Sequence, residues 1–304
     1  MPEELAETAH GITICHESFG DPSAEPLLLV MGLGTQMIAW NDDFCAELAS
    51  RGFFVVRFDN RDVGRSTHHD FPAPTLRQIF SRRLPAEQYT LDDMARDAAA
   101  LMDALDLESA HLVGASMGGM ISQVLAARRP ERVRSLVSIM SNTGSRMSGQ
   151  PALSIYRHFF KDAPAEREAF AEHAARLFSL IGSTELGAEL DEIRDVARRS
   201  FDRGHNPAGT GRQLGAIAKT GNRTRLLRGI GVPTLVIHGT ADRLVRPSGG
   251  RATARAIPGA RLELIDRMGH DLPRAAWPRI IDGIVANAER AGGAGTPVTQ
   301  AQSV

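Results

Sequence analysis

The chain has 304 residues, of which 42% are hydrophobic and 23% charged, so it can form one large core with an inserted lobe or two modest domains. Its 35 basic and 36 acidic side chains give a formal net charge of -1, which provides no electrostatic argument for binding to nucleic acid or an anionic membrane. We therefore expect a small-molecule substrate and no nucleic-acid partner. Two cysteines are too few for a disulfide framework, and we expect buried thiols at Cys15 and Cys45.

The N-terminal segment shows no sign of an export signal. Residues 1–5 are acidic, and no apolar region follows them, so we expect no secretory signal. The longest apolar runs, such as residues 26–31, are far too short to span a bilayer. These features predict a cytoplasmic protein without a membrane span, and they leave its oligomeric state open.

Apolar runs of strand length alternate with amphipathic stretches of helix length along most of the chain. Residues 12–19 alternate between apolar and polar and are predicted to form a strand of an early antiparallel pair. Later strands are expected at residues 27–31, 53–58, 111–115, 133–140, 233–238 and 261–265. Helices are expected between them at residues 42–49, 90–105 and 117–128. This order predicts an α/β fold with a mostly parallel, doubly wound sheet of about eight strands.

The alternation stops between residues 144 and 228, where helix-like segments (152–161, 164–180, 186–203 and 210–220) occur without a convincing strand. We predict that residues 1–143 and 229–290 form the core and that residues 144–228 form an inserted helical cap. Such a cap would shape a pocket and exclude water. The alternative is a set of helices packed on the sheet without a gating role. Residues 291–304 lack apolar periodicity, which predicts a disordered tail.

Residues 114–118 read Gly-Ala-Ser-Met-Gly, the G-x-S-x-G pattern of a tight strand-to-helix turn. The apolar run before this pattern and the helix-like stretch after it supply the context that the turn needs. Such a turn lifts the Ser116 hydroxyl to the carboxyl edge of the sheet, where doubly wound folds bind ligands. We therefore predict that Ser116 is a nucleophile. The alternative is a glycine-rich turn at an ordinary strand–helix junction.

A serine hydroxyl needs a neighbouring base to take its proton, and His270 is the best candidate among ten histidines. It follows the last predicted strand, which places its loop at the same edge of the sheet as Ser116. Asp242 follows the preceding strand and is predicted to orient the imidazole. Asp271 is adjacent to His270, but side chains of neighbouring residues diverge too far for that hydrogen bond. The predicted triad is therefore Ser116, Asp242 and His270.

Acyl transfer also requires hydrogen-bond donors for the oxyanion that develops at the carbonyl. The backbone N–H of Met117 is expected at a helix N-terminus, which favours negative charge. Residues 31–34, Met-Gly-Leu-Gly, follow a predicted strand and are expected to pass Ser116. The backbone N–H of Leu33 is the second predicted donor. A purely structural glycine turn is the alternative for this loop.

These residues together resemble the α/β-hydrolase superfamily over residues 11–288, including its order of serine, aspartate and histidine. Residues 58–66 look like the D-x-R-x-x-G-x-S loop of capped members, which we interpret as structural bracing rather than catalysis. The chain departs from many relatives at Met31, where they carry histidine. Within the superfamily, residues 30–34, Trp40 and residues 60–66 look most like the aclacinomycin methylesterase group.

The predicted triad and the resemblance imply a serine esterase that cleaves a carboxylic ester of a small, largely apolar substrate through an acyl-enzyme. Ser116, in the strand-to-helix turn, differs from the aspartate that haloalkane dehalogenases and epoxide hydrolases carry at the equivalent position. Serine at this position therefore points to acyl transfer or a related reaction. Other reactions of the same triad are alternatives: C–C bond hydrolysis, thioester cleavage, and cofactor-free perhydrolysis or haloperoxidation. A non-catalytic ligand receptor is a further alternative. The sequence contains no metal-ligand cluster, P-loop or dinucleotide motif, so we expect no cofactor and no bound metal.

Overall fold

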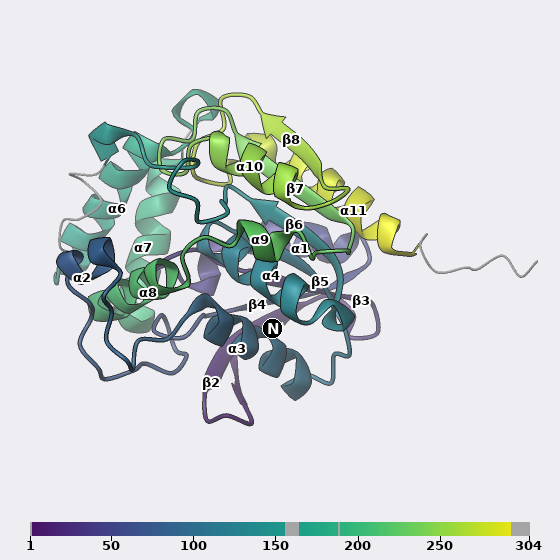
Figure 1. Cartoon of the computed structure of the whole chain (residues 1–304), viewed down its shortest axis with the longest axis horizontal. Coiled ribbons are helices and arrows are strands. Elements are labelled where there is room, and N and C mark those ends of the chain that lie inside the picture. Colours follow the sequence, from purple (N-terminus) through teal and green to yellow (C-terminus); the bar gives the residue numbers. More distant parts are fainter. Residues whose placement is uncertain (1, 156–163, 188, 293–304) are drawn as a thin grey trace, which may run out of the picture.

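A twisted eight-stranded sheet runs through the computed structural model, which describes residues 2–155, 164–187 and 189–292 (Figure 1). Its order is β1-β2-β4-β3-β5-β6-β7-β8. The strands are β1 Glu4–Glu7, β2 Thr13–Phe19, β3 Glu25–Val30, β4 Phe53–Phe58, β5 Ala110–Ala115, β6 Val133–Ile139, β7 Thr234–Gly239 and β8 Arg261–Ile265. The β1–β2 and β2–β4 pairs are antiparallel, and all other neighbours are parallel. The predicted fold class is confirmed.

Helices cover both faces of this sheet (Figure 1). On one face Leu28 and Val30 of β3 join an apolar cluster with residues of α3 and α4. On the other face Leu27 and Leu29 join a cluster with residues of α1 and α11. Successive side chains of a strand point to opposite faces, so a continuous apolar run fills both clusters. The bounds of these helices are α1 Asp42–Ser50, α3 Leu91–Ala104, α4 Met117–Arg128 and α11 Trp277–Gly292.

The segment between β6 and β7 contains helices and no strand in its described residues. The α-helices described in this segment are α6 Arg167–Ile181, α7 Leu190–Gly204, α8 Pro207–Thr220 and α9 Thr224–Leu227. Helices α6 and α7 pack against each other, and α8 contacts the short helix α2, Leu76–Ser81 (Figure 1). The helix predicted at residues 152–161 lies largely outside the described residues.

Several helical boundaries differ from the sequence-based expectation: α6 begins at Arg167 rather than at residue 164, α7 begins at Leu190 rather than at residue 186, and the start of α8 and the end of α11 also differ. The helix predicted from residue 210 begins at Pro207, because the Asn206 side chain accepts the Gly209 N–H and proline suits the first helical position. At the C-terminus, α11 continues to Gly292, so the first two residues of the predicted tail are helical. Residues 293–304 lie outside the described residues.

The expectation for the cysteines is met. Cys15 and Cys45 are both free and buried, as predicted. None of the helices described here is long and apolar enough to cross a membrane.

A further helix of the core, α10 Ser248–Ala256, follows β7 and precedes β8 in the chain. It contributes Ala256 to the apolar cluster that contains α3 and α4.

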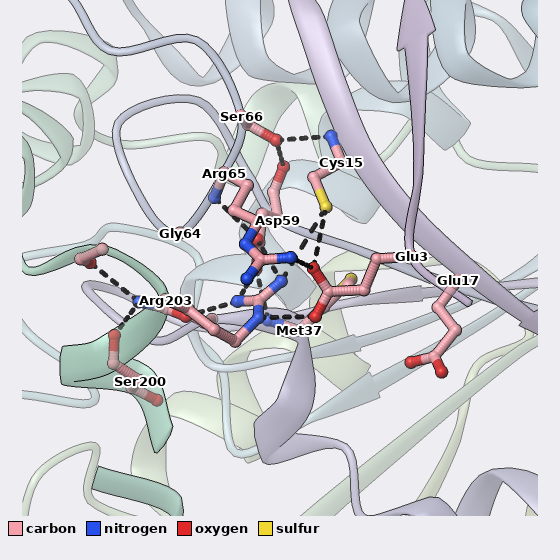
Figure 2. A network of polar contacts seen from close by, with 12 residues as sticks. Glu3, Cys15, Glu17, Met37, Asp59, Gly64, Arg65, Ser66, Ser200 and Arg203 are labelled. Atoms are coloured by element: carbon pink, nitrogen blue, oxygen red, sulfur yellow. Dashed lines mark hydrogen bonds and ion pairs between the residues drawn. The ribbon is translucent and has the colours of Figure 1, made fainter. Parts of the chain in front are cut away.

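The loop after β4 connects the sheet to α7 through the fully buried carboxylate of Asp59 (Figure 2). Asp59 accepts the backbone N–H groups of Met37 at 2.7 Å and Arg65 at 3.0 Å, and it pairs with Arg203 of α7 at 2.9 Å. Gly64 has a φ of 58°, and a Cβ there would lie 2.0 Å from Asp59 Oδ2. Glycine at this position therefore makes room for the carboxylate.

The same loop connects to α8 through Asp62, which is also fully buried. Asp62 pairs with Arg212 of α8 at 2.7 Å and accepts the Tyr89 hydroxyl at 2.8 Å. Its neighbour Arg61 pairs with the buried Asp97 of α3 at 2.5 Å. Buried carboxylates with ionic partners hold the loop between the core and two helices. These contacts agree with the interpretation of residues 58–66 as bracing.

Arg203→Met is expected to lower the free energy of unfolding by about 3 kcal/mol, because it leaves Asp59 buried without its ionic partner. Arg65→Met is the matched control, since Arg65 pairs with the same Glu3 as Arg203 but has a side chain that is 53% exposed. The control should cost less than about 1 kcal/mol. Urea unfolding followed by circular dichroism measures both changes. Equal losses in the two variants would contradict this assignment.

Candidate active site

Ser116 occupies the turn between β5 and α4 with a φ of 55° and a ψ of −117°. Such a backbone is costly for a residue other than glycine and persists because its surroundings hold it. A Cβ on Gly114 would lie 2.3 Å from the carbonyl oxygen of Gly118, and a Cβ on Gly118 would lie 1.9 Å from that of Val30. The two glycines therefore let the turn, the helix and β3 approach closely, as the G-x-S-x-G pattern predicts.

The imidazole of His270 lies between Ser116 and Asp242. Its Nε2 is 3.0 Å from Ser116 Oγ, and its Nδ1 is 2.8 Å from Asp242 Oδ2. The three residues follow β5, β7 and β8, whose carboxyl ends meet at one edge of the parallel sheet. The three predicted residues therefore come together in the arrangement of a nucleophile, a base and an orienting acid.

The carboxyl group of Asp242 is buried, and both of its oxygens have hydrogen-bond partners. Oδ1 accepts the N–H groups of Leu244 and Val245, both at 2.9 Å, and Oδ2 lies 3.4 Å from Nε2 of the buried His238. Burial alone would raise the pKa of Asp242, but the interaction with His270 and the hydrogen bonds from both histidines hold this pKa below its ordinary value. The carboxylate is thus ionised at neutral pH and can stabilise an imidazolium.

The two segments that contain the predicted oxyanion donors lie beside Ser116. Met117 opens α4, where the first amides of a helix lack intrahelical acceptors. A Cβ built on Gly32 would lie 3.2 Å from Ser116 Cβ, which puts the loop that contains Leu33 next to the nucleophile. Backbone amides from these two segments can donate to an oxygen that develops negative charge at the attacked carbonyl.

Two side chains that the sequence analysis did not identify anchor this loop. Asn60 Nδ2 donates to the carbonyl oxygen of Met31 at 3.0 Å, so the backbone is held without a histidine at that position. Gln213 of α8 accepts the Gly34 N–H and donates to the carbonyl oxygen of Arg61, both at 2.8 Å. Gln213 and Gly34 are 179 residues apart, so no local pattern links them.

Asp271 makes its hydrogen bonds away from the imidazole. Its carboxylate accepts the backbone N–H of Ser183 at 3.0 Å and also the Ser183 hydroxyl. Burial raises the pKa of Asp271, and these two hydrogen bonds partly offset that rise. The expectation that the side chain of Asp271 diverges from His270 agrees with this arrangement, and Asp242 is the acid that contacts the ring.

Comparisons with known proteins agree with the fold and the motifs. The family model described as alpha/beta hydrolase fold matches residues 25–273. Rhodomycin D methylesterase DnrP of Streptomyces peucetius is 30% identical over 318 aligned positions, which cover 96% of this chain and 99% of that protein.

Two solved structures are also similar. The enol-lactonase from Burkholderia xenovorans LB400 has 25% identity and a TM-score of 0.69, over 95% of this chain and 100% of that one. Esterase RhEst1 from Rhodococcus sp. ECU1013 has 20% identity and a TM-score of 0.74, over 96% of this chain and 100% of that one. From the family match and the long alignment with the methylesterase, we conclude that the chain belongs to the alpha/beta hydrolase fold family.

Proposed function

We propose that the chain is a serine hydrolase that cleaves carboxylic esters of small, largely apolar substrates through an acyl-enzyme on Ser116. The contact of His270 with both Ser116 Oγ and Asp242 is the observation that carries this proposal. The similarity to a methylesterase, which spans nearly the full length of both chains, favours an ester as the bond that is cleaved. It also makes methyl esters the first substrate class to test.

The reaction begins when Ser116 Oγ attacks the ester carbonyl and His270 Nε2 accepts the hydroxyl proton. The resulting imidazolium is stabilised by the ionised Asp242, and the oxyanion accepts hydrogen bonds from the N–H groups of Leu33 and Met117. His270 then gives its proton to the leaving alcohol, and the acyl group stays on Ser116. In the second half, His270 takes a proton from water and the resulting hydroxide attacks the acyl carbon. The tetrahedral intermediate then expels Ser116 Oγ, to which His270 returns the proton, and the acid leaves.

In this proposal residues 144–228 form a cap over the site, and residues 1–143 and 229–290 form the hydrolase core. The support is that helices of this segment form hydrogen bonds with the loops that contain Leu33 and His270. Gln213 of α8 binds the loop with Leu33, and the carbonyl oxygen of Ile181, the last residue of α6, accepts the N–H of His270. A cap in this position excludes water from the charged intermediate, which strengthens the hydrogen bonds to its oxyanion.

The test combines catalysis with covalent labelling. Wild-type protein is assayed on p-nitrophenyl esters from acetate to dodecanoate and on methyl esters of aromatic acids. It is also treated with a fluorophosphonate and digested for peptide mass analysis. We expect ester hydrolysis with a chain-length optimum and one phosphonate adduct per chain, on Ser116.

Two results would contradict the proposal. A folded protein that hydrolyses no ester and takes no adduct would favour the non-catalytic receptor. An adduct on Ser116 without hydrolysis of any ester would keep the nucleophile but move the reaction to thioester cleavage, C–C bond hydrolysis or perhydrolysis.

A further inference from the structure

The end of α6 lies against the loop that carries His270. The His270 N–H donates at 2.7 Å to the carbonyl oxygen of Ile181, the last residue of α6. Carbonyl groups in the last turn of a helix lack intrahelical donors, so this bond satisfies both partners. A Cβ on Gly269 would lie 2.4 Å from the carbonyl carbon of Gly182. The two backbones therefore meet with no room for a side chain between them.

Ser183 and Asp271 complete this contact through their side chains. Ser183 Oγ accepts the Gly269 N–H at 2.8 Å and donates to the Asp271 carboxylate, which also accepts the Ser183 N–H at 3.0 Å. Ser183 is fully buried, so water does not compete for these hydrogen bonds. We call Ser183, Gly269 and Asp271 the clasp.

We propose that the clasp positions His270 for catalysis, so that Ser183 and Asp271 are positioning residues; this inference rests on the proposed function. The His270 ring has to keep Nε2 at Ser116 and Nδ1 at Asp242 at the same time. The position of the His270 backbone therefore affects catalysis, since a small shift of this backbone lengthens one of the two contacts of the ring.

The loop is held from two sides. On the sheet side, the carbonyl oxygen of Met268 accepts the Ala241 N–H at 3.0 Å, and a Cβ on Gly239 would lie 2.0 Å from the same oxygen. On the other side the clasp and the Ile181 carbonyl hold the next three residues, 269–271. The first restraint belongs to the sheet, whereas the second depends on the segment between β6 and β7.

Loss of the clasp should act on the rate of reaction rather than on binding. A displacement of a catalytic group by about 1 Å can reduce a rate by about 100-fold. The hydrogen bonds of the clasp join Ser183, Gly269 and Asp271, and they involve neither the Ser116 hydroxyl nor the loop that contains Leu33. We therefore expect Ser183→Ala to lower kcat for a p-nitrophenyl ester by about 10- to 100-fold and to change KM by less than about twofold.

Three further variants make the test specific. Ser183→Thr keeps the hydroxyl and should restore kcat to within about threefold of the wild type. Asp271→Leu removes the acceptor and should resemble Ser183→Ala. Ser179→Ala is the matched control, because Ser179 lies in the last turn of α6, shortly before Ser183, but is exposed and its hydroxyl donates to the Arg176 carbonyl oxygen. This control should leave kcat unchanged.

A wild-type kcat in Ser183→Ala, or equal losses in Ser183→Ala and Ser179→Ala, would overturn the proposal. Hydrogen exchange of the peptide that contains residues 266–272 tests the clasp without any substrate. Faster exchange is expected in folded Ser183→Ala than in wild type, because the Gly269 N–H loses its acceptor. Unchanged exchange would reject the clasp even if no ester proves to be a substrate, so the two proposals can fail separately.

Discussion

Ser116→Gly should abolish ester hydrolysis and at the same time make the fold more stable. Loss of the nucleophile of a serine triad lowers kcat by about a million-fold. Ser116 holds a φ of 55°, a backbone conformation that glycine adopts freely. Relief of this strain should raise the free energy of unfolding by about 1 kcal/mol, even after the larger backbone entropy of unfolded glycine is counted. Ester kinetics and urea unfolding measure the two effects.

Ser116→Ala separates the two contributions. It removes the same hydroxyl, and with it the hydrogen bond to His270, but it keeps a Cβ on the strained backbone. We expect its activity to be as low as that of Ser116→Gly and its stability to be lower. Equal unfolding free energies for the two variants would show that the backbone of the turn is not strained. Ester hydrolysis by Ser116→Ala above about 1% of the wild-type rate would reject Ser116 as the nucleophile.

Asp242→Asn should lower kcat by about ten thousand-fold with little change in the shape of the site. The carboxylate accepts from His270 Nδ1 and thereby leaves Nε2 free to accept the serine proton. An amide at this position can donate to Nδ1, which selects the wrong tautomer, and it cannot neutralise an imidazolium. The rate constant for hydrolysis of a p-nitrophenyl ester is the quantity to measure.

Asp266→Asn is the control for this variant. Asp266 follows β8 at the same edge of the sheet, but its side chain is 76% exposed and binds Thr240 and Arg267 instead of a histidine. Its replacement should change kcat by less than about twofold. A loss of less than about 100-fold in Asp242→Asn, or a similar loss in Asp266→Asn, would contradict the role assigned to Asp242.

Much of the fold could be predicted because each signal was contained in a short stretch of sequence. A five-residue apolar run predicted the doubly buried strand β3, since both faces of the sheet are covered. Short elements were harder to recognise. Helix α2 was missed, although Thr75 and Gln78 form a capping box, because six residues are too few to show a helical period.

The triad could also be predicted, although its members are far apart in sequence. Each of them follows a strand, and the rule that carboxyl ends of parallel strands meet at one edge brings them together. The nucleophile turn needed only the glycine spacing at residues 114–118, whose close contacts the structure shows. The prediction of the triad depends on which strand each residue follows. The order of the strands along the chain can be read directly from the sequence.

The sequence by itself therefore determined the α/β class, the strand order along the chain and three residues that could react. Only the tertiary structure decided which side chains hold the loops that carry them. The pairs Asp59–Arg203, Gly34–Gln213 and Ser183–Asp271 are separated by 144, 179 and 88 residues. Each pair depends on how the helices between β6 and β7 lie against the sheet. That arrangement results from packing between distant surfaces, and no periodicity within either partner encodes it.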